Sequence, residues 1–167
     1  APPPIDISGL VTQSASRVAA SVGDFYGALY KRGQHYGPLW KVIATMWTTS
    51  PAGWAMGRLR SRGSSSGPFV HPADLDAALQ LGFADDLAST DSQRTQVPFA
   101  IDQVLMQAIR RDLWAVAQAI GGRGSTDAHL HPRDARRFGV QISRLRTRFV
   151  PQNMTGALLN SPRLAAY

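Results

Sequence analysis

The sequence predicts an α+β fold in which an antiparallel β-sheet wraps around one central α-helix. Three segments carry this prediction: a capped helix at 71–81, a hairpin pattern at 40–60, and a series of strand-like segments after residue 97. A lone amphipathic helix that lies between a hairpin and antiparallel strands can bury its apolar face against the sheet that those strands form.

The composition is that of one folded domain. The chain has 167 residues, of which 44% are hydrophobic and 17% charged, and this usage is ordinary for globular proteins. The 15 glycines and 11 prolines therefore mark turns rather than disorder. The chain contains no cysteine, which excludes disulfides and thiolate metal sites and fits a reducing compartment.

No segment predicts a membrane span or a signal peptide. The chain lacks the apolar run of about 18 to 20 residues that crosses a bilayer. Its opening letters, APPP, have neither a basic stretch nor an apolar signal core. We therefore expect a cytoplasmic protein with no membrane partner.

An excess of arginine gives the chain a net charge of +7, which would attract nucleic acid, an anionic membrane or an acidic protein. The arginines are scattered in small groups, without a basic helix or the aromatic-interleaved motif of an RNA-binding domain. We therefore expect no nucleic-acid partner and interpret these arginines as a solvated surface.

The first sixty residues predict a linker, a helix and a hairpin. Residues 1–8 are rich in proline and predict an extended linker. From Ser14 to Leu29 apolar residues recur every three or four positions, which predicts a helix that Gly33 closes. Trp40–Trp47 and Trp54–Arg60 have strand composition and flank a turn at 50–53, so we expect a β-hairpin.

The segment His71–Leu81 has the clearest helix pattern. Pro72 suits the first helical position, where no N–H is needed, and Asp74 places a negative charge in the first turn. Leu75 and Leu79, with the flanking alanines, predict the buried face. Residues 62–68, with three serines and two glycines, predict a flexible connection before this helix.

Three further strands are predicted at 97–107, 113–120 and 138–149, and a short one at 126–130. Turn residues separate them at 121–124 and 131–134. One helix enclosed by a hairpin and these antiparallel strands is the hot-dog architecture.

The helix carries the strongest functional signal. Asp76 and Gln80 are four residues apart and so share one helical face. A carboxylate and an amide that project together from an otherwise apolar helix need water, a partner or a substrate, because burying them unpaired costs several kcal/mol. From the pattern alone, a surface stripe with a hydrogen bond between the two side chains is the favoured interpretation.

The surrounding letters favour the functional interpretation. The segment HPADLDAALQ at 71–80 resembles the HPxxLDxxxQ motif in the second hot-dog of polyketide synthase dehydratases. Phe25-Tyr26 and GQHYGPLW at 33–40 resemble the FY…GxxYGPxF segment of that family, with Trp40 in place of the usual Phe. VPFAI at 97–101 resembles its LPFxx strand, and 139–148 resembles its closing strand. The resemblance extends to about Val150.

The resemblance implies a specific chemistry. Asp76 would be the acidic member of a His/Asp dyad, with Gln80 holding it by a hydrogen bond. Elimination of water from a β-hydroxyacyl thioester needs a base for the α-proton and an acid for the departing hydroxyl. The resemblance also implies a substrate tunnel, lined by Tyr36, Gly37, Pro38, His71, Pro72, Leu75, Pro98 and Phe99. Turn formation and core packing explain Tyr36 and Pro38 equally well.

The chain departs from the family in one respect. The base of the dyad is a His in an HxxxGxxxxP motif of the first hot-dog, and this motif does not occur among the printed residues. We interpret His71 as a helix cap or a packing group rather than a base. His129 and His131 are interpreted as surface residues without a metal, because no third ligand lies near them in the sequence. We therefore expect no metal site, and we expect the fragment alone to be inactive.

The resemblance divides the chain into an inter-hot-dog linker (1–13), a C-terminal hot-dog (14–150) and a tail (151–167). The implied partners are the N-terminal hot-dog half, an acyl carrier protein that bears the substrate on phosphopantetheine, other synthase domains and a second copy in a homodimer. No cofactor is expected in this domain. Arg144, Arg146 and Arg148 share one strand face, which is either a solvated face or a carrier docking surface.

Three alternatives remain open at this point. A product template domain would use a similar His/Asp pair for aldol cyclisation of a poly-β-ketone, and a double-bond isomerase or pyran-forming cyclase would use the same scaffold. A non-catalytic hot-dog would serve dimerisation or carrier-protein docking.

Overall fold

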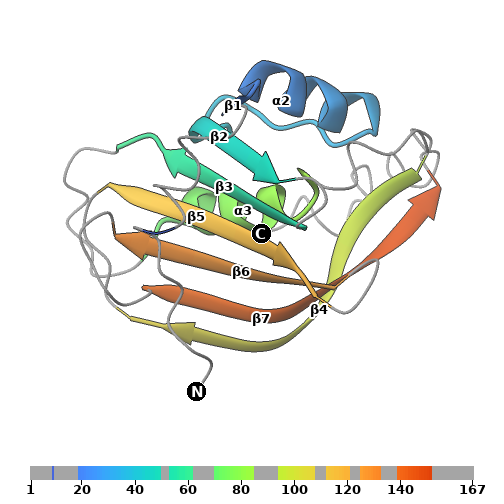
Figure 1. Cartoon of the computed structure of the whole chain (residues 1–167). Helices are drawn as coiled ribbons and strands as arrows, with labels where there is room; N and C mark the ends of the chain where they lie inside the picture. The colour runs from blue at the N-terminus through green and yellow to red at the C-terminus, as the bar shows by residue number, and fades with distance from the viewer. Residues whose placement is uncertain are drawn as a thin grey trace, which may run out of the picture.

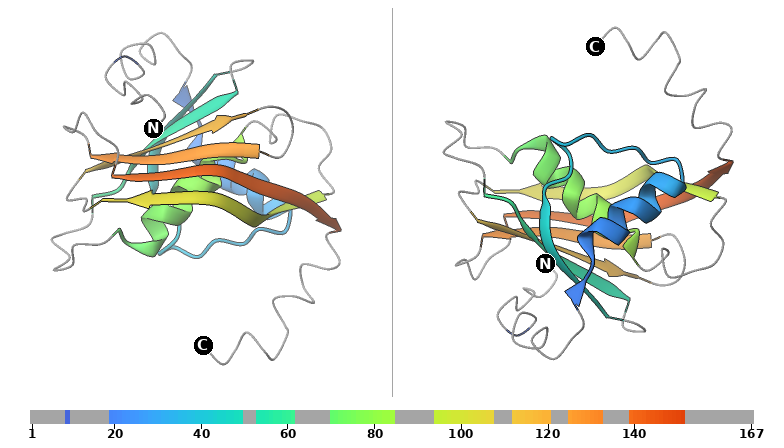
Figure 2. Two further views of the ribbon diagram at one scale, coloured as in Figure 1. Left: turned by 90° about the horizontal axis from the view of Figure 1, so that it is seen from below. Right: turned by 90° about the horizontal axis from the view of Figure 1, so that it is seen from above.

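The computed structural model describes residues 9, 19–49, 53–61, 70–84, 94–107, 112–120, 125–132 and 139–151. Seven strands form one antiparallel sheet in the order β1-β2-β3-β5-β6-β7-β4, and helices α2 and α3 lie on the same side of it (Figures 1 and 2). The strands are β1 (Ala19–Ala20), β2 (Ile43–Thr49), β3 (Trp54–Leu59), β4 (Arg94–Met106), β5 (Leu113–Ala119), β6 (Ser125–Pro132) and β7 (Val140–Pro151), and the helices are α2 (Val22–Lys31) and α3 (Pro72–Leu81). The predicted hot-dog fold is confirmed.

The predicted hairpin is present, but its first strand begins later than expected. β2 and β3 pair antiparallel from the turn end, Thr49 opposite Trp54, to Ile43 opposite Leu59. Trp40 is not in the strand, because its N–H donates to the carbonyl of Gly37 (3.0 Å) and closes a turn. The 62–68 connection lies outside the described residues.

The first helix is shorter than its apolar spacing predicted. Ser21 caps α2 by accepting the N–H of Asp24 (3.1 Å), so the helix begins at Val22. Ala19 and Ala20 pair with β2 instead, and residues 14–18 lie outside the described part. At the other end Gly33 has a φ of 83°, a left-handed conformation that suits glycine and ends the helix as expected.

Helix α3 has the predicted bounds, and its N-terminus is capped as predicted. The side chain of His71 accepts the N–H of Ala73 at Nδ1 (3.1 Å), and Pro72 follows at the first helical position. His71 is therefore a helix cap, as interpreted from the sequence.

The buried face of α3 is only in part the predicted one. Ala73, Ala77, Ala78 and Leu81 are at most 1% exposed, whereas Leu75 and Leu79 are only half-buried. At 100° per residue, both leucines lie on the side of the helix opposite Ala77. The alanines of the predicted face are buried as expected, whereas Leu75 and Leu79 are only partly buried and pack against the margin of the core.

Small residues let the helix approach the sheet closely. α3 contacts β3, β5 and β6, and Gly57 of β3 lies directly beneath it. A Cβ at Gly57 would lie 3.2 Å from Cδ1 of Leu81 and 3.3 Å from Cγ2 of Ile43, tighter than ordinary van der Waals contact.

The last four strands confirm the predicted series, and the short strand at 126–130 is an eight-residue strand, β6. The edge strand β4 has a bulge between Pro98 and Ala100. Pro98 is tolerated there because an edge strand does not need every N–H. β7 has an irregular residue, Arg144 (φ 51°), whose N–H donates to Asp127 (2.7 Å). β4 and β7 bend around the end of the sheet (Figure 1), as bulged strands do.

The arginines of β7 are partly compensated. Asp102 of β4 lies 2.5 Å from Arg146 and 3.8 Å from Arg144. Both arginine side chains are more than half exposed, so these ion pairs contribute little to stability. The side chain of Arg148 lies outside the described residues.

The opposite side of the sheet carries a second apolar cluster. Met56, Trp114 and Val116 are buried there, and Trp47 stacks on Trp114 with ring centroids 5.5 Å apart. On β6, His129 and His131 are 6% and 2% exposed. The interpretation of these histidines as surface residues was wrong: residues 126, 128 and 130 face α3, so strand alternation places 129 and 131 on this second buried face.

His131 is neutral in this environment. Burial, followed by the neighbouring His129, lowers the pKa of His131 to about 4. Its Nε2 atom is buried and, among the described residues, has no hydrogen-bond partner. An imidazolium in the same place would be strongly disfavoured.

Within the described residues, no helix has the length and hydropathy that a membrane span requires. The predicted linker and tail at the two ends of the chain fall almost entirely outside these residues, so the proposed boundaries at 13 and 151 stay predictions.

The close approach of α3 predicts that Gly57 cannot be replaced by a larger residue. Gly57→Val is expected to destabilise the fold by about 1 to 3 kcal/mol through overpacking, measured by urea unfolding. Gly27→Ala in α2 is the control, since a Cβ there meets nothing within 4 Å and alanine favours a helix by up to about 1 kcal/mol. Equal stability of the Gly57→Val variant would contradict the packing described.

The buried histidine predicts acid-sensitive folding. The pKa of His131 is lower in the folded chain than in the unfolded one. The neutral His131 side chain therefore contributes fully to the free energy of unfolding above about pH 6.5, and this contribution is lost as pH falls toward 4. Each pKa unit is equivalent to about 1.4 kcal/mol, so a shift from 6.5 to about 4 corresponds to a loss of at most about 3.5 kcal/mol. His131→Phe should flatten the dependence of the unfolding free energy on pH between 7 and 4. An unchanged slope would show that His131 is solvated.

Candidate functional site

The predicted pair on α3 is formed. The Nε2 atom of Gln80 donates to Oδ2 of Asp76 at 2.6 Å. Gln80 is fully buried and Asp76 is half-buried, because they lie at the flank of the helix between its sheet-facing side and its far side. The predicted hydrogen bond between them is therefore present in the structure.

Two other elements complete the surroundings of Gln80. The hydroxyl of Tyr26, in α2, donates to Oε1 of Gln80 (2.9 Å). Nε2 of Gln80 also donates to the carbonyl of Trp40 (3.2 Å). The turn from Gly37 to Trp40 places that carbonyl, so the GPLW segment shapes the site through its backbone.

Burial determines the electrostatics of the site. Desolvation raises the pKa of Asp76 above its ordinary value, and the hydrogen bond from Gln80 opposes this rise. Desolvation also raises the pKa of Tyr26 to about 12 and raises that of Tyr36, with the charge of Asp76 adding to both shifts. The site therefore favours neutral forms of its acids, and Asp76 retains a proton more readily than a solvated carboxyl does.

Two tyrosines lie beside the carboxyl. The rings of Tyr26 and Tyr36 meet edge to face, with centroids 6.2 Å apart. Lys41 lies over the Tyr26 ring at 5.6 Å, which places a cation at the exposed side of this group.

The other residues predicted for a substrate tunnel lie in different places. Gly37 and Pro38 are exposed in the turn before β2, and His71 and Pro72 are exposed at the start of α3. Leu75 is half-buried, and Pro98 and Phe99 are exposed on the edge strand β4. The structure brings Tyr36 to Asp76, whereas a tunnel lined by the remaining residues stays a prediction.

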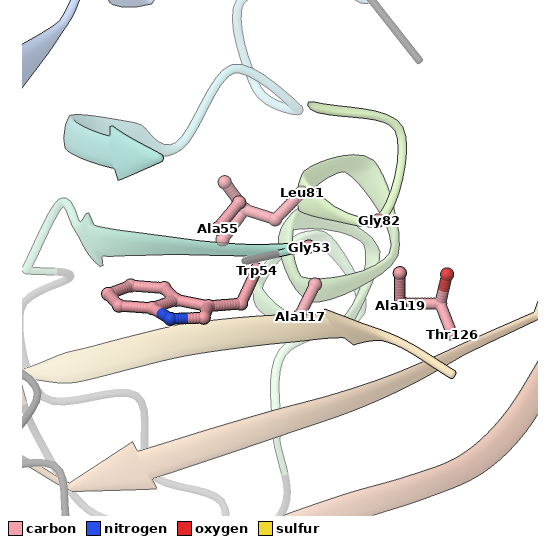
Figure 3. A pocket seen from close by; sticks show the side chains of 8 residues that line it. All are labelled: Gly53, Trp54, Ala55, Leu81, Gly82, Ala117, Ala119 and Thr126. Carbon is pink, nitrogen blue, oxygen red and sulfur yellow. The ribbon is translucent and has the colours of Figure 1, made fainter. Parts of the chain in front are cut away.

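A hollow lies at the C-terminal end of α3 (Figure 3). It has about 180 Å³ of empty space, including its open mouth, and its lining consists of Gly53, Trp54, Ala55, Leu81, Gly82, Ala117, Ala119 and Thr126. No titratable side chain belongs to this lining, so the hollow offers no acid or base. Asp76, which lies outside this hollow, is therefore the candidate acid.

No metal centre is formed by the residues that the structure describes, since no three His, Cys, Asp or Glu side chains among them lie close enough to share an ion.

Comparison with known proteins identifies the family. A protein-family model described as "Polyketide synthase dehydratase N-terminal domain" matches residues 8–152. The chain belongs to this polyketide synthase dehydratase family. No curated protein sequence matches it.

Solved dehydratase structures share the fold. The chain resembles the inactive Asp-to-Asn mutant of the CurK dehydratase (21% identity, TM-score 0.73; 92% of this chain and 55% of that one). It also resembles the dehydratase domain from the CurF module of curacin polyketide synthase (20%, TM-score 0.72; 90% and 53%). A third is the dehydratase domain of RzxB from Pseudomonas fluorescens (18%, TM-score 0.69; 81% and 50%). The dehydratase chain described here thus spans about half the length of these structures.

The description of the family model and the motif at 71–80 differ over which half of a dehydratase this chain is. The description refers to an N-terminal domain, whereas HPADLDAALQ resembles the second hot-dog. The assignment to one half is therefore part of the proposal below.

Sequence reasoning missed two groups of the site. Tyr26 was noted only as part of the family resemblance, although a buried Tyr hydroxyl needs a partner and the helical spacing of Phe25, Tyr26 and Leu29 indicated burial. The Trp40 carbonyl has no sequence signal, because any residue at that position has a backbone oxygen.

Burial of Asp76 predicts a pH-dependent gain of stability in the Asp76→Asn variant. Because the pKa of Asp76 is raised in the folded chain, its favourable contribution is present below the unfolded value near 3.8 and is lost as pH rises through the folded value. The variant lacks this loss, so it should unfold at higher urea than the parent at pH 7, with the difference shrinking toward pH 4.

Asp24→Asn is the control for this comparison, because Asp24 is an exposed carboxyl in the first turn of α2 and should give no such gain. If Asp76→Asn were destabilised by the same amount at every pH, the buried carboxylate would be fully compensated and the electrostatic account would be wrong.

Proposed function

We propose that this chain is the C-terminal hot-dog of a polyketide synthase dehydratase, in which Asp76 protonates the hydroxyl that leaves a β-hydroxyacyl thioester. The observation that supports this proposal most directly is the Asp76–Gln80 hydrogen bond of 2.6 Å at a half-buried position on the central helix. A protonated carboxyl in such a place can serve as a general acid.

The geometry supports the direction of proton transfer. Gln80 donates to Oδ2 of Asp76, so Oδ1 is the oxygen that can reach the substrate hydroxyl. Loss of that hydroxyl as water requires a proton from the acid, while a base removes the α-proton and its electron pair forms the C–C double bond. Asp76 supplies the proton that converts the leaving hydroxyl to water, and the base that removes the α-proton comes from another part of the synthase.

The choice of the C-terminal half rests on which catalytic group the chain has. The chain has the Asp76 motif and lacks the HxxxGxxxxP segment among its printed residues. Two CurK dehydratase structures are described as inactive mutants, one with an Asp changed to Asn and one with a His changed to Phe. The description of these mutants as inactive indicates that this enzyme depends on both residue types, and we propose that Asp76 corresponds to the Asp.

The edge strand β4 supports a partner hot-dog. Large apolar side chains on it are 38–53% exposed, namely Phe99, Ile101, Val104, Leu105 and Met106. A long apolar edge is a template for pairing with another sheet. The N-terminal hot-dog half is proposed to cover it, and a second copy would do so in a homodimer of the isolated chain.

The proposal includes the substrate and its delivery. An acyl carrier protein would present the β-hydroxyacyl group on phosphopantetheine, and neighbouring synthase domains would supply and consume it. No further cofactor is required, since elimination of water is a proton-transfer reaction without net oxidation or reduction.

The test is to pair this chain with an N-terminal dehydratase half that carries HxxxGxxxxP and to incubate the pair with a β-hydroxyacyl carrier protein. Intact-protein mass spectrometry should show loss of one water from the acyl group. Asp76→Asn should lower the rate by about 10² to 10⁴, the contribution of a general acid, while the exposed Asp24→Asn variant should keep it.

Two outcomes would contradict the proposal. If a C-terminal dehydratase half restored activity and an N-terminal half did not, this chain would be the N-terminal half. If a folded pair bound the carrier protein without changing the acyl mass, the chain would be a docking module. A mass change by cyclisation of a poly-β-ketone substrate would indicate a product template domain instead.

A further inference from the structure

The buried hydroxyl of Tyr26 has no role in the function proposed above. Tyr26 lies on α2, is 8% exposed, and donates its hydroxyl proton to Oε1 of Gln80 at 2.9 Å. The hydroxyl oxygen of Tyr26 also accepts a hydrogen bond from the backbone N–H of Ile43 in β2. Tyr26 thus links three elements that are distant in the sequence.

The contacts of Gln80 are consistent with one orientation of its amide. The carbonyl of Trp40 and the carboxylate of Asp76 are both acceptors, so the Nε2 hydrogens must point toward them. Oε1 then faces Tyr26, whose hydroxyl accepts from Ile43 and has its own hydrogen left to donate. A flipped amide would oppose its oxygen to two acceptors and lose both hydrogen bonds.

We propose that Tyr26 is a positioning residue, which fixes the amide of Gln80 so that its N–H group holds the carboxylate of Asp76. The inference rests on the proposed role of Asp76 for its meaning in catalysis, but the contacts that carry it do not. Tyr26 touches neither the reacting atoms nor Asp76 by a hydrogen bond, and acts through Gln80.

The effect of removing the hydroxyl follows from the balance at Asp76. Burial raises the pKa of Asp76 and the Gln80 hydrogen bond lowers it. Without the Tyr26 hydroxyl, Oε1 of the fully buried Gln80 loses its donor, and the amide keeps only two of the three hydrogen bonds that hold it in place. The hydrogen bond to Asp76 then weakens, so it lowers the pKa of Asp76 less and burial raises that pKa further.

The experiment is a carboxyl-detected NMR titration of Asp76 in the 167-residue chain, which requires no catalysis. Tyr26→Phe should raise the pKa of Asp76, and Gln80→Leu should raise it as well. In the double variant the Tyr26 change should add nothing further, because the two residues act on Asp76 in series. Tyr30→Phe is the matched control: Tyr30 is on the same helix, is 62% exposed and stacks on His35, so its hydroxyl should have no effect.

The inference is overturned if Gln80→Leu raises the pKa of Asp76 and Tyr26→Phe leaves it unchanged. Should Tyr26→Phe fail to fold, the unmodified chain decides: the two Nε2 protons of Gln80 should exchange slowly with solvent and shift with the titration of Asp76, and rapid exchange would overturn the inference. If these effects are observed and the chain, paired with an N-terminal dehydratase half, still dehydrates no substrate, only the proposed function is refuted.

Discussion

Helix α3 can lie close against the sheet because small residues face each other at the contact, and the rest of the site depends on this contact. Alanines at 73, 77 and 78 face the strands, and Gly57 offers bare backbone beneath Leu81. Close contact fixes the rotation of the helix about its own axis. With Ala77 toward the sheet, Gln80 and Asp76 project at successively larger angles toward α2 and the turn at Gly37–Trp40. Gln80 is therefore fully buried and Asp76 half-buried because of how the helix packs on the sheet.

A fully buried glutamine is costly unless all its polar atoms are paired. Here the donors and acceptors come from α2, from the turn before β2 and from α3 itself, and a leucine at the same position would need none of them. An apolar core would be simpler to assemble and no less stable. This network lies next to a carboxyl that burial keeps from ionising freely, which is the arrangement that the proposed general acid would require.

Local signals in the sequence were enough to predict α3, the hairpin and the later strands, because caps, turns and alternation act over a few residues. The bounds of α3 were predicted because Pro72 and its His71 cap are local features. Orientation was harder: the leucines at 75 and 79 looked like the core face, and only the tight helix–sheet contact explains why alanines take that place. The burial of the β6 histidines was not predicted for a similar reason. His129 and His131 are polar residues, and only the tertiary structure shows that a second apolar cluster lies on their face of the sheet. The Asp76–Gln80 bond was predictable from i, i+4 spacing, but the Trp40 carbonyl and the role of Tyr26 depend on tertiary structure.

In the proposed enzyme, this network would prepare half of the catalytic pair within one hot-dog. An acid and a base that work together need opposite protonation states at the same pH, so their environments must shift their pKa values independently. The two causes that shift the pKa of Asp76 in the part of the chain that the structure describes, burial and the hydrogen bond from Gln80, both come from this fold. In the proposed enzyme the base belongs to the other hot-dog, where a different environment can tune it. Division of the pair between two halves would thus separate the tuning of the acid from that of the base, while the apolar edge of β4 would bring the two halves together.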